Sequence, residues 1–176
     1  MTITIRLAKA DDVPALEELI PRSARELSWP YYTHAQIEAA IRYVFGVDSQ
    51  LIADGTYYVA LEDDRVVGCG GWSRRRTLYG GDQRPMGAGA LLDPSVDGAR
   101  IRAFFVSGRH ARQGIGALIL AACAEAARSS GFSRLELMST LPGVPFYERH
   151  GFREVERVID TLPDGTAIEF VRMTRP

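Results

Sequence analysis

The sequence predicts a mixed, mostly antiparallel β-sheet of about six to seven strands with helices on both faces, a fold of the α/β or α+β class. Three observations support this. Apolar or alternating runs of strand length recur along the 176 residues. Turn signals at Asp63–Asp64 and at Pro163–Gly165 join consecutive strands into antiparallel hairpins. An apolar helical stretch between strands at 99–106 and 133–140 predicts one parallel crossover.

The elements are expected in the order β-α-α-β-β-β-α-β-α-β-β. Residues 2–8 alternate β-branched and polar side chains, which is typical of an edge or half-buried strand. Asp11 or Asp12 is placed to cap a first helix, whose pattern breaks at Pro30, and Thr33 is placed to cap a second. The apolar positions of that second helix are Ile37, Ala40, Ile41, Val44 and Phe45.

The middle of the chain predicts a hairpin of strands 56–63 and 65–72, followed by a long loop at 73–98. A loop of this length in a compact domain is usually functional or mobile. We expect the basic run Arg74–Arg76 within it to be solvated.

The later elements are each bounded by glycine or proline signals. Gly131 is expected to end the helix that follows the glycine turn, because glycine is common just past a helix C-terminus. The predicted elements are the strand 99–106, the helix 117–131, the strand 133–140, the short helix 144–150, and the strands 152–162 and 166–175.

Composition and charge limit the function classes. A formal net charge of −1 argues against a general nucleic-acid binder. Cys69 and Cys123 lie in apolar segments, which predicts two buried thiols rather than a disulfide framework. The three histidines have no cysteine close by, so the sequence predicts no zinc site.

The N-terminal residues carry no signal-peptide pattern, and no apolar run approaches membrane-spanning length. We therefore expect a single domain over residues 1–176, located in the cytoplasm and without a membrane partner.

The segment HARQGIG (110–116) predicts an anion site. It lies between an apolar strand and a helix, so the N–H groups of residues 113–117 have no intrahelical partner. The helix dipole adds partial positive charge there, and Gly114 and Gly116 allow a phosphate to approach the backbone. The alternative is a glycine-rich turn without a ligand. A Walker A loop would need a lysine, and a dinucleotide fingerprint would need a third glycine.

The stretch VSGRHARQGIGALIL (106–120) resembles motif A of the GNAT N-acetyltransferase superfamily, which holds the pyrophosphate of acetyl-CoA. PFYERHGF (145–152) resembles that family's F-Y-E-x-x-G-F segment. The chain departs from the family at three positions: Ala111 replaces a frequent Arg or Gln, Thr140 a frequent Asn, and Gly143 a frequent Ala.

The resemblance implies an acetyl-CoA-dependent N-acetyltransferase that needs no metal and transfers the acetyl group to a primary amine by direct attack on the thioester. It implies that the backbone of β-strand residues before the turn, at a bulge, contacts the pantetheine arm and the acetyl oxygen. The implied cofactor-binding residues are Phe104, Phe105, Val106, Arg112, Gln113, Gly114, Ile115, Gly116 and Ala117.

The resemblance gives Tyr147 the role of general acid toward the departing thiolate, and a phenol holds its proton at neutral pH. The alternative is a packed aromatic side chain beside Phe146. No carboxylate lies on strand 99–106, and Glu136 on the next strand is either a base or a solvated residue, so no general base is assigned.

The acceptor, a small-molecule or peptide amine, is not specified by the sequence. Trp29, Tyr31, Tyr32 and Trp72 are candidate walls of its cleft, or else surface and core aromatics. The loop 73–98 is a further candidate wall or a homodimer contact. Two other functions stay open: a catalytically silent acyl-CoA-binding or sensing module, and a nucleotide-binding P-loop protein.

Overall fold

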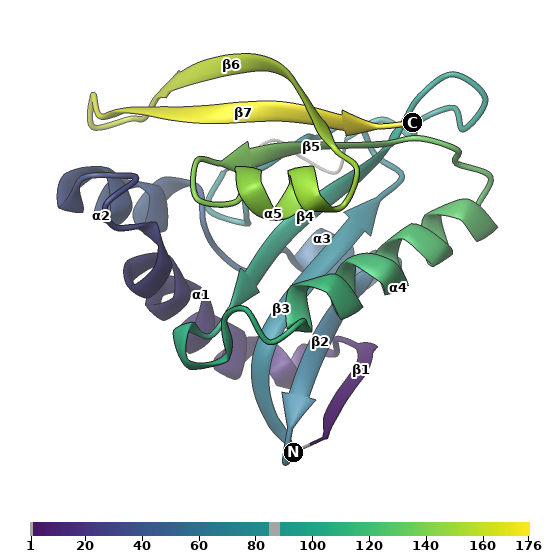
Figure 1. Cartoon of the computed structure of the whole chain (residues 1–176), viewed down its shortest axis with the longest axis horizontal. Coiled ribbons are helices and arrows are strands. Elements are labelled where there is room, and N and C mark those ends of the chain that lie inside the picture. Colours follow the sequence, from purple (N-terminus) through teal and green to yellow (C-terminus); the bar gives the residue numbers. More distant parts are fainter. Residues whose placement is uncertain (1, 85–88) are drawn as a thin grey trace.

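The computed structural model describes residues 2–84 and 89–176. Within these ranges the strands form one seven-stranded sheet in the order β1-β2-β3-β4-β5-β7-β6 (Figure 1). Neighbouring strands are antiparallel except β4 and β5, which are parallel, as the sequence predicts. The strands are β1 (Ile3–Leu7), β2 (Tyr57–Glu62), β3 (Arg65–Ser73), β4 (Ala99–Val106), β5 (Leu135–Thr140), β6 (Arg153–Thr161) and β7 (Ala167–Arg175).

Five α-helices and two short 3₁₀ turns (Ala10–Asp12 and Gly108–His110) connect the described strands. Thr33 caps the second helix as predicted, because its side chain accepts a hydrogen bond from the Gln36 N–H. The α-helices are α1 (Val13–Ser28), α2 (His34–Tyr43), α3 (Ser49–Asp54), α4 (Ile115–Ser129) and α5 (Val144–Arg149).

Helix α3 is missing from the predicted order, which is therefore wrong at this point. The helix has six residues, too few to show a helical period. Its ends are nevertheless well defined: Asp48 accepts from the Leu51 N–H, and Gly55 has a φ of 71°. Helix α2 is also shorter than expected, since it ends at Tyr43, and Val44 and Phe45 lie beyond it in the core.

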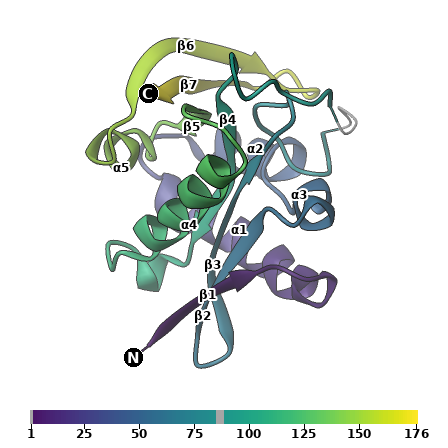
Figure 2. The same ribbon diagram turned by 90° about the vertical axis from the view of Figure 1, so that its right-hand side faces the viewer.

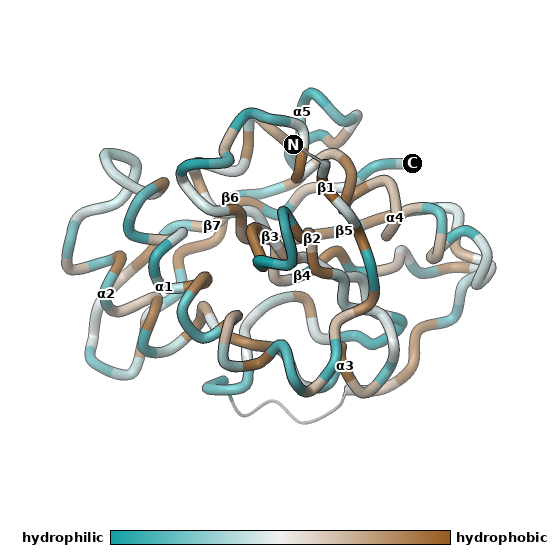
Figure 3. The backbone as a smooth tube through the Cα atoms, turned by 90° about the horizontal axis from the view of Figure 1, so that it is seen from below, coloured by the Kyte–Doolittle hydropathy of each residue, from teal (hydrophilic) through white to brown (hydrophobic). Residues whose placement is uncertain are grey.

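Two apolar cores cover the two faces of the sheet. One core, called the α4 core below, contains Ile115, Ile119 and Cys123 of α4. The other, called the α1–α2 core, contains residues of α1, α2 and α3 such as Leu16 and Leu51. Figure 2 shows α4 and α3 on opposite sides of β2 and β3. The hydrophobic segments follow the strands through the middle of the molecule (Figure 3). Cys69 and Cys123 are both buried free thiols, as predicted.

The loop 73–98 is partly paired with itself. Arg75 and Leu91 form an antiparallel bridge, and the Arg76 N–H donates to the Ala90 carbonyl at 2.9 Å. The expectation that Arg74–Arg76 is solvated is wrong for Arg75, whose guanidinium bonds Asp54 at 2.8 Å. Residues 85–88 of this loop lie outside the described residues.

Across the described residues, no group of three or more acidic, histidine or cysteine side chains is arranged to hold a metal ion. None of the helices in the described part of the chain has both the length and the apolar character needed to span a membrane.

Candidate active site

The parallel strands β4 and β5 separate soon after they begin. They pair only from Ala99–Leu135 to Ile101–Leu137, and beyond that point they diverge (Figure 1). Residues 102–106 of β4 therefore have no strand partner on the β5 side, where the Val106 carbonyl instead accepts a hydrogen bond from the Ser23 hydroxyl at 2.7 Å. The divergence leaves an opening through the sheet.

A β-bulge in β4 changes which side chains face which helices. The register with β3 shifts between Cys69 and Gly71, and Ala103 has a φ of 58°. As a result Ile101 and Phe104, three residues apart, both face the α4 core, whereas Phe105 faces the α1–α2 core. A bulge at this strand is what the family resemblance implies.

The glycine turn has the geometry of an anion site. Gly114 has a φ of 83°, and a Cβ placed on it would meet no atom within 4 Å, so the space around it is open. The first amide of α4 that finds a helical acceptor is Leu118 N–H, which donates to Gly114. The amides of Ile115, Gly116 and Ala117 remain available at the positive end of the helix dipole.

Gly116 brings α4 close to α5. A Cβ at Gly116 would lie 3.1 Å from the Phe146 ring, so a larger residue would displace that ring. The two sequence motifs, which are 30 residues apart in the chain, thus contact each other beside the opening. The open turn, the free amides and this close approach together fit the pyrophosphate and pantetheine of a coenzyme A molecule.

A pocket of about 260 Å³ lies in the opening between β4 and β5. It is lined by residues 101–106 of β4, the end of β5 and the start of α5, together with α1, residues 44–46 and residues 78–81. The long loop therefore contributes to the wall, as one of the two alternatives for it predicts. The predicted site residues in the lining are Phe104, Phe105, Val106, Gly116 and Tyr147.

The other predicted cofactor residues lie on the turn itself. Arg112, Gln113 and Gly114 are exposed, and Ala117 is half-buried. The Ile115 side chain is buried in the α4 core, so this residue can offer only its amide. Gln113 donates its side-chain amide to the Arg109 carbonyl at 3.0 Å, which steadies the turn.

Tyr147 lies at the cofactor side of the pocket and is 8% exposed. Its ring packs edge-on against Phe104, Phe146 and Phe152. Burial raises the pKa of the Tyr147 phenol well above its usual value, so the hydroxyl keeps its proton at neutral pH. Both sequence interpretations, a packed aromatic and a proton donor, are compatible with this placement.

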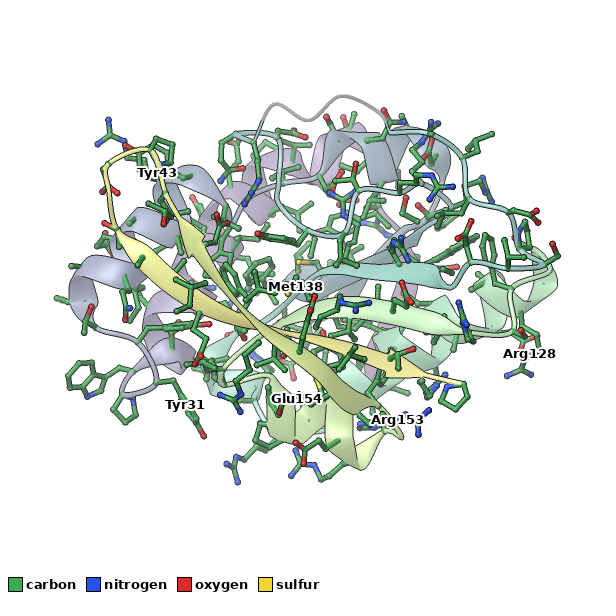
Figure 4. The ribbon with its side chains drawn as sticks, turned by 90° about the horizontal axis from the view of Figure 1, so that it is seen from above. Tyr31, Tyr43, Arg128, Met138, Arg153 and Glu154 are labelled. Carbon is green, nitrogen blue, oxygen red and sulfur yellow. The ribbon has the colours of Figure 1, made fainter. Side chains whose placement is uncertain are left out.

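The four aromatic residues predicted as acceptor walls do not line this pocket. Trp29 and Tyr31 are exposed, and Figure 4 shows Tyr31 at the periphery, pointing outward. Tyr32 is a core residue whose hydroxyl donates to the Glu169 carbonyl at 2.6 Å. Trp72 packs against Phe132.

The acceptor side is instead lined by five residues; the sequence analysis assigned one of them, Phe105, to the cofactor site and either placed the others in the core or did not single them out. Only assembly of the fold brings them together, because they come from five separate segments. They are Phe45, Tyr79, Phe105, Met138 and Phe170.

No carboxylate is found among the described lining residues of the pocket. Glu136 is not among them and forms an ion pair with Arg100. The one charged side chain in the described lining is Arg102, which contacts Asp48 at 2.6 Å and donates to the Gly80 carbonyl at 2.6 Å. Burial raises the pKa of Asp48 and lowers that of Arg102, each opposed by the charge of the other.

Comparison with known structures supports this architecture. A GCN5-related N-acetyltransferase from Rhodopseudomonas palustris superposes with a TM-score of 0.73 at 17% identity, covering 99% of this chain and 96% of the other. PaiA N-acetyltransferase from Thermoplasma acidophilum, solved in complex with coenzyme A, gives 0.66 at 14% identity and 99% of both chains. A ribosomal-protein-alanine N-acetyltransferase from Brucella melitensis gives 0.63 at 18% identity and 98% of both.

The search for relatives among curated proteins gave no match. The sequence model of the Acetyltransferase (GNAT) family matches residues 21–152, which is more than half of the chain and includes both motifs. The protein therefore belongs to the GNAT acetyltransferase family and is an acyltransferase that takes its acetyl group from acetyl-CoA.

Proposed function

We propose that the protein transfers the acetyl group of acetyl-CoA to a primary amine by direct attack of the amine on the thioester, with Tyr147 as general acid. The observation that carries this proposal is the pocket in the β4–β5 opening, which joins the glycine turn on one face of the sheet to an apolar acceptor side on the other.

Different residues would bind different parts of acetyl-CoA. Amides at the turn, from Gln113 to Ala117, would hold the pyrophosphate, with Arg112 beside them. The β4 backbone at Phe104, Phe105 and Val106, which has no strand partner on its β5 side, would hold the pantetheine arm and the acetyl oxygen. When bound, acetyl-CoA supplies an acyl group activated as a thioester.

The proton balance follows from the groups present. The amine nitrogen bonds to the acetyl carbon as the carbon–sulfur bond breaks, and the departing sulfur takes the proton of Tyr147. The amine's surplus proton leaves to water at the pocket mouth, since no described lining residue is a carboxylate or an imidazole. Tyr147 regains its proton from the same solvent.

Tyr147→Phe tests the role of Tyr147. We expect kcat to fall by about ten- to a thousandfold, because a thiolate leaving group tolerates partial loss of general acid catalysis. The KM for acetyl-CoA should change little, because the ring still packs against Phe104 and Phe146.

The matched control is Tyr43→Phe, since Tyr43 lies on α2 and is not among the pocket-lining residues. Steady-state kinetics of both variants would measure kcat and the KM for acetyl-CoA. Full turnover by Tyr147→Phe would make Tyr147 a packing residue only. A wild-type protein that binds coenzyme A in calorimetry but acetylates no amine in a broad panel would contradict the proposed transfer.

A further inference from the structure

The pocket has two chemically distinct halves on opposite faces of the sheet. The cofactor half belongs to the α4 core and contains Phe104, Val106, Phe146 and Tyr147. The acceptor half belongs to the α1–α2 core and contains Phe45, Tyr79, Phe105, Met138 and Phe170. Figure 4 shows Met138 near the middle of the molecule rather than at its periphery.

Four aromatic rings form most of the acceptor half. The Phe45 ring packs edge-on against Phe105, with ring centroids 5.6 Å apart, and against Phe170 at 6.4 Å. Tyr79 also packs against Phe170, with ring centroids 5.3 Å apart. Rings in contact with each other present an apolar surface that suits an apolar or aromatic body.

Three side-chain hydroxyls around this surface are already bonded within the protein. Ser23 donates its hydroxyl to the Val106 carbonyl at 2.7 Å, and Ser139 donates to the Thr140 carbonyl at 2.7 Å. The Tyr79 hydroxyl points to Asp160, to which it donates at 2.8 Å. These three hydroxyls therefore have no hydrogen left to donate to the body of a ligand.

The charges near the pocket favour a ligand with a single amine. Arg102 is cationic, and the two carboxylates that bond lining residues are each paired with an arginine: Asp48 with Arg102 at 2.6 Å and Asp160 with Arg84 at 2.6 Å. A second ammonium group in the acceptor half would be desolvated without a partner, which is costly. Desolvation lowers the pKa of a bound ammonium and so favours the neutral, reactive amine.

From this geometry we infer that the acceptor is a monoamine with an uncharged apolar body of aromatic size, and not a polyamine or a lysine-rich peptide. This inference rests on the proposed function, because it concerns the substrate of the same transfer.

A matched set of amines tests the inference. Butylamine and 1,4-diaminobutane have the same carbon chain and differ by one ammonium, and 2-phenylethylamine adds a ring. We expect kcat/KM to be highest for 2-phenylethylamine and lowest for the diamine, with butylamine at least about tenfold above the diamine. A diamine used as well as butylamine would overturn the inference and leave the proposed transfer intact. No transfer to any of the three by a protein that acetylates another amine of the broad panel would also overturn the inference alone.

A charge variant provides an independent test. Leu27 lines the pocket on α1 and is 37% exposed, so a glutamate can be accommodated there without burying its carboxylate. The quantity to compare is kcat/KM for 1,4-diaminobutane divided by kcat/KM for butylamine. Leu27→Glu should raise this ratio by about tenfold relative to Leu27→Gln, which has the same shape without the charge. Equal ratios in the two variants would show that the acceptor's second charge does not enter this half, and would overturn the inference.

Discussion

The carbonyl of Ala103 accepts hydrogen bonds from two buried side chains on different strands. The Tyr57 hydroxyl of β2 donates to it at 3.3 Å, and the Cys69 thiol of β3 donates at 3.7 Å. Ala103 has a φ of 58°, a left-handed conformation that costs a non-glycine residue about 1–2 kcal/mol. The two donors help to hold the bulge in place, and the bulge aims the backbone of Phe104 and Phe105 at the opening.

Tyr57→Phe tests this support. Loss of one hydrogen bond, worth about 0.5–1.5 kcal/mol, should lower kcat/KM for acetyl-CoA by about three- to tenfold by loosening the bulge. Tyr58→Phe is the control, because Tyr58 is the next residue of β2 and belongs to the opposite core. Equal kcat/KM values for the two variants would show that the bulge is held without the Tyr57 hydroxyl.

The bulge also shows where residue-level prediction failed. Strict alternation along β4 places residues 101, 103 and 105 on one face, whereas the structure places Ile101 with Phe104 and Val106. No residue within 104–106 indicates from its type alone that a bulge adds an extra residue to this strand. Only the resemblance implied a bulge, because its position depends on the pairing with β3 and on donors located more than 30 residues away.

At the scale of elements, the strand–turn–helix unit of β4 and α4 forms the cofactor side of the site and is specified by residues that are adjacent in the sequence. Its glycine turn, its apolar stripe and its terminating Gly131 are all encoded within adjacent residues, so the sequence predicted them well. Helix α3 was missed because it is short and is held by tertiary contacts, among them the Asp54–Arg75 pair. The acceptor half was missed because its rings come from segments far apart in the chain.

Gly114→Asp should abolish coenzyme A binding without unfolding the protein. A carboxylate at the helix start would repel the pyrophosphate, and we expect the affinity to fall on the order of a hundredfold or more. Gly165→Asp is a matched control: Gly165 has a φ of 87° and open space around it, like Gly114, but lies in the β6–β7 turn. Calorimetric titration that finds the same coenzyme A affinity in both variants would remove the turn from the site.

For the whole molecule, the Arg102–Asp48 pair connects parts that are distant in the chain. Arg102 lies on β4, Asp48 caps α3, and the Gly80 carbonyl that Arg102 contacts belongs to the long loop. Both side chains of the pair are almost fully buried. The pair thus fixes α3 and the 78–81 wall to the strand that forms the site.

Arg102→Met should destabilise the fold by about 3–5 kcal/mol, because it leaves the Asp48 charge buried without a partner. The double variant Arg102→Met with Asp48→Asn should recover most of this loss, since asparagine also caps a helix and carries no charge. Urea denaturation measures both free energies of unfolding. Equal losses in the single and double variants would show that the unpaired charge is not the cause.

The two halves of the pocket differ in how they are distributed along the chain. The cofactor half comes from the stretch between Phe104 and Tyr147, whereas three of the five acceptor-half residues come from outside it: from the segment after α2, the long loop and β7. Most acceptor-wall residues can therefore be exchanged by mutation without altering the segment that binds the common donor. In evolutionary terms, such an arrangement separates a fixed module from a variable one and allows new acceptors to be acquired while the acetyl donor stays the same.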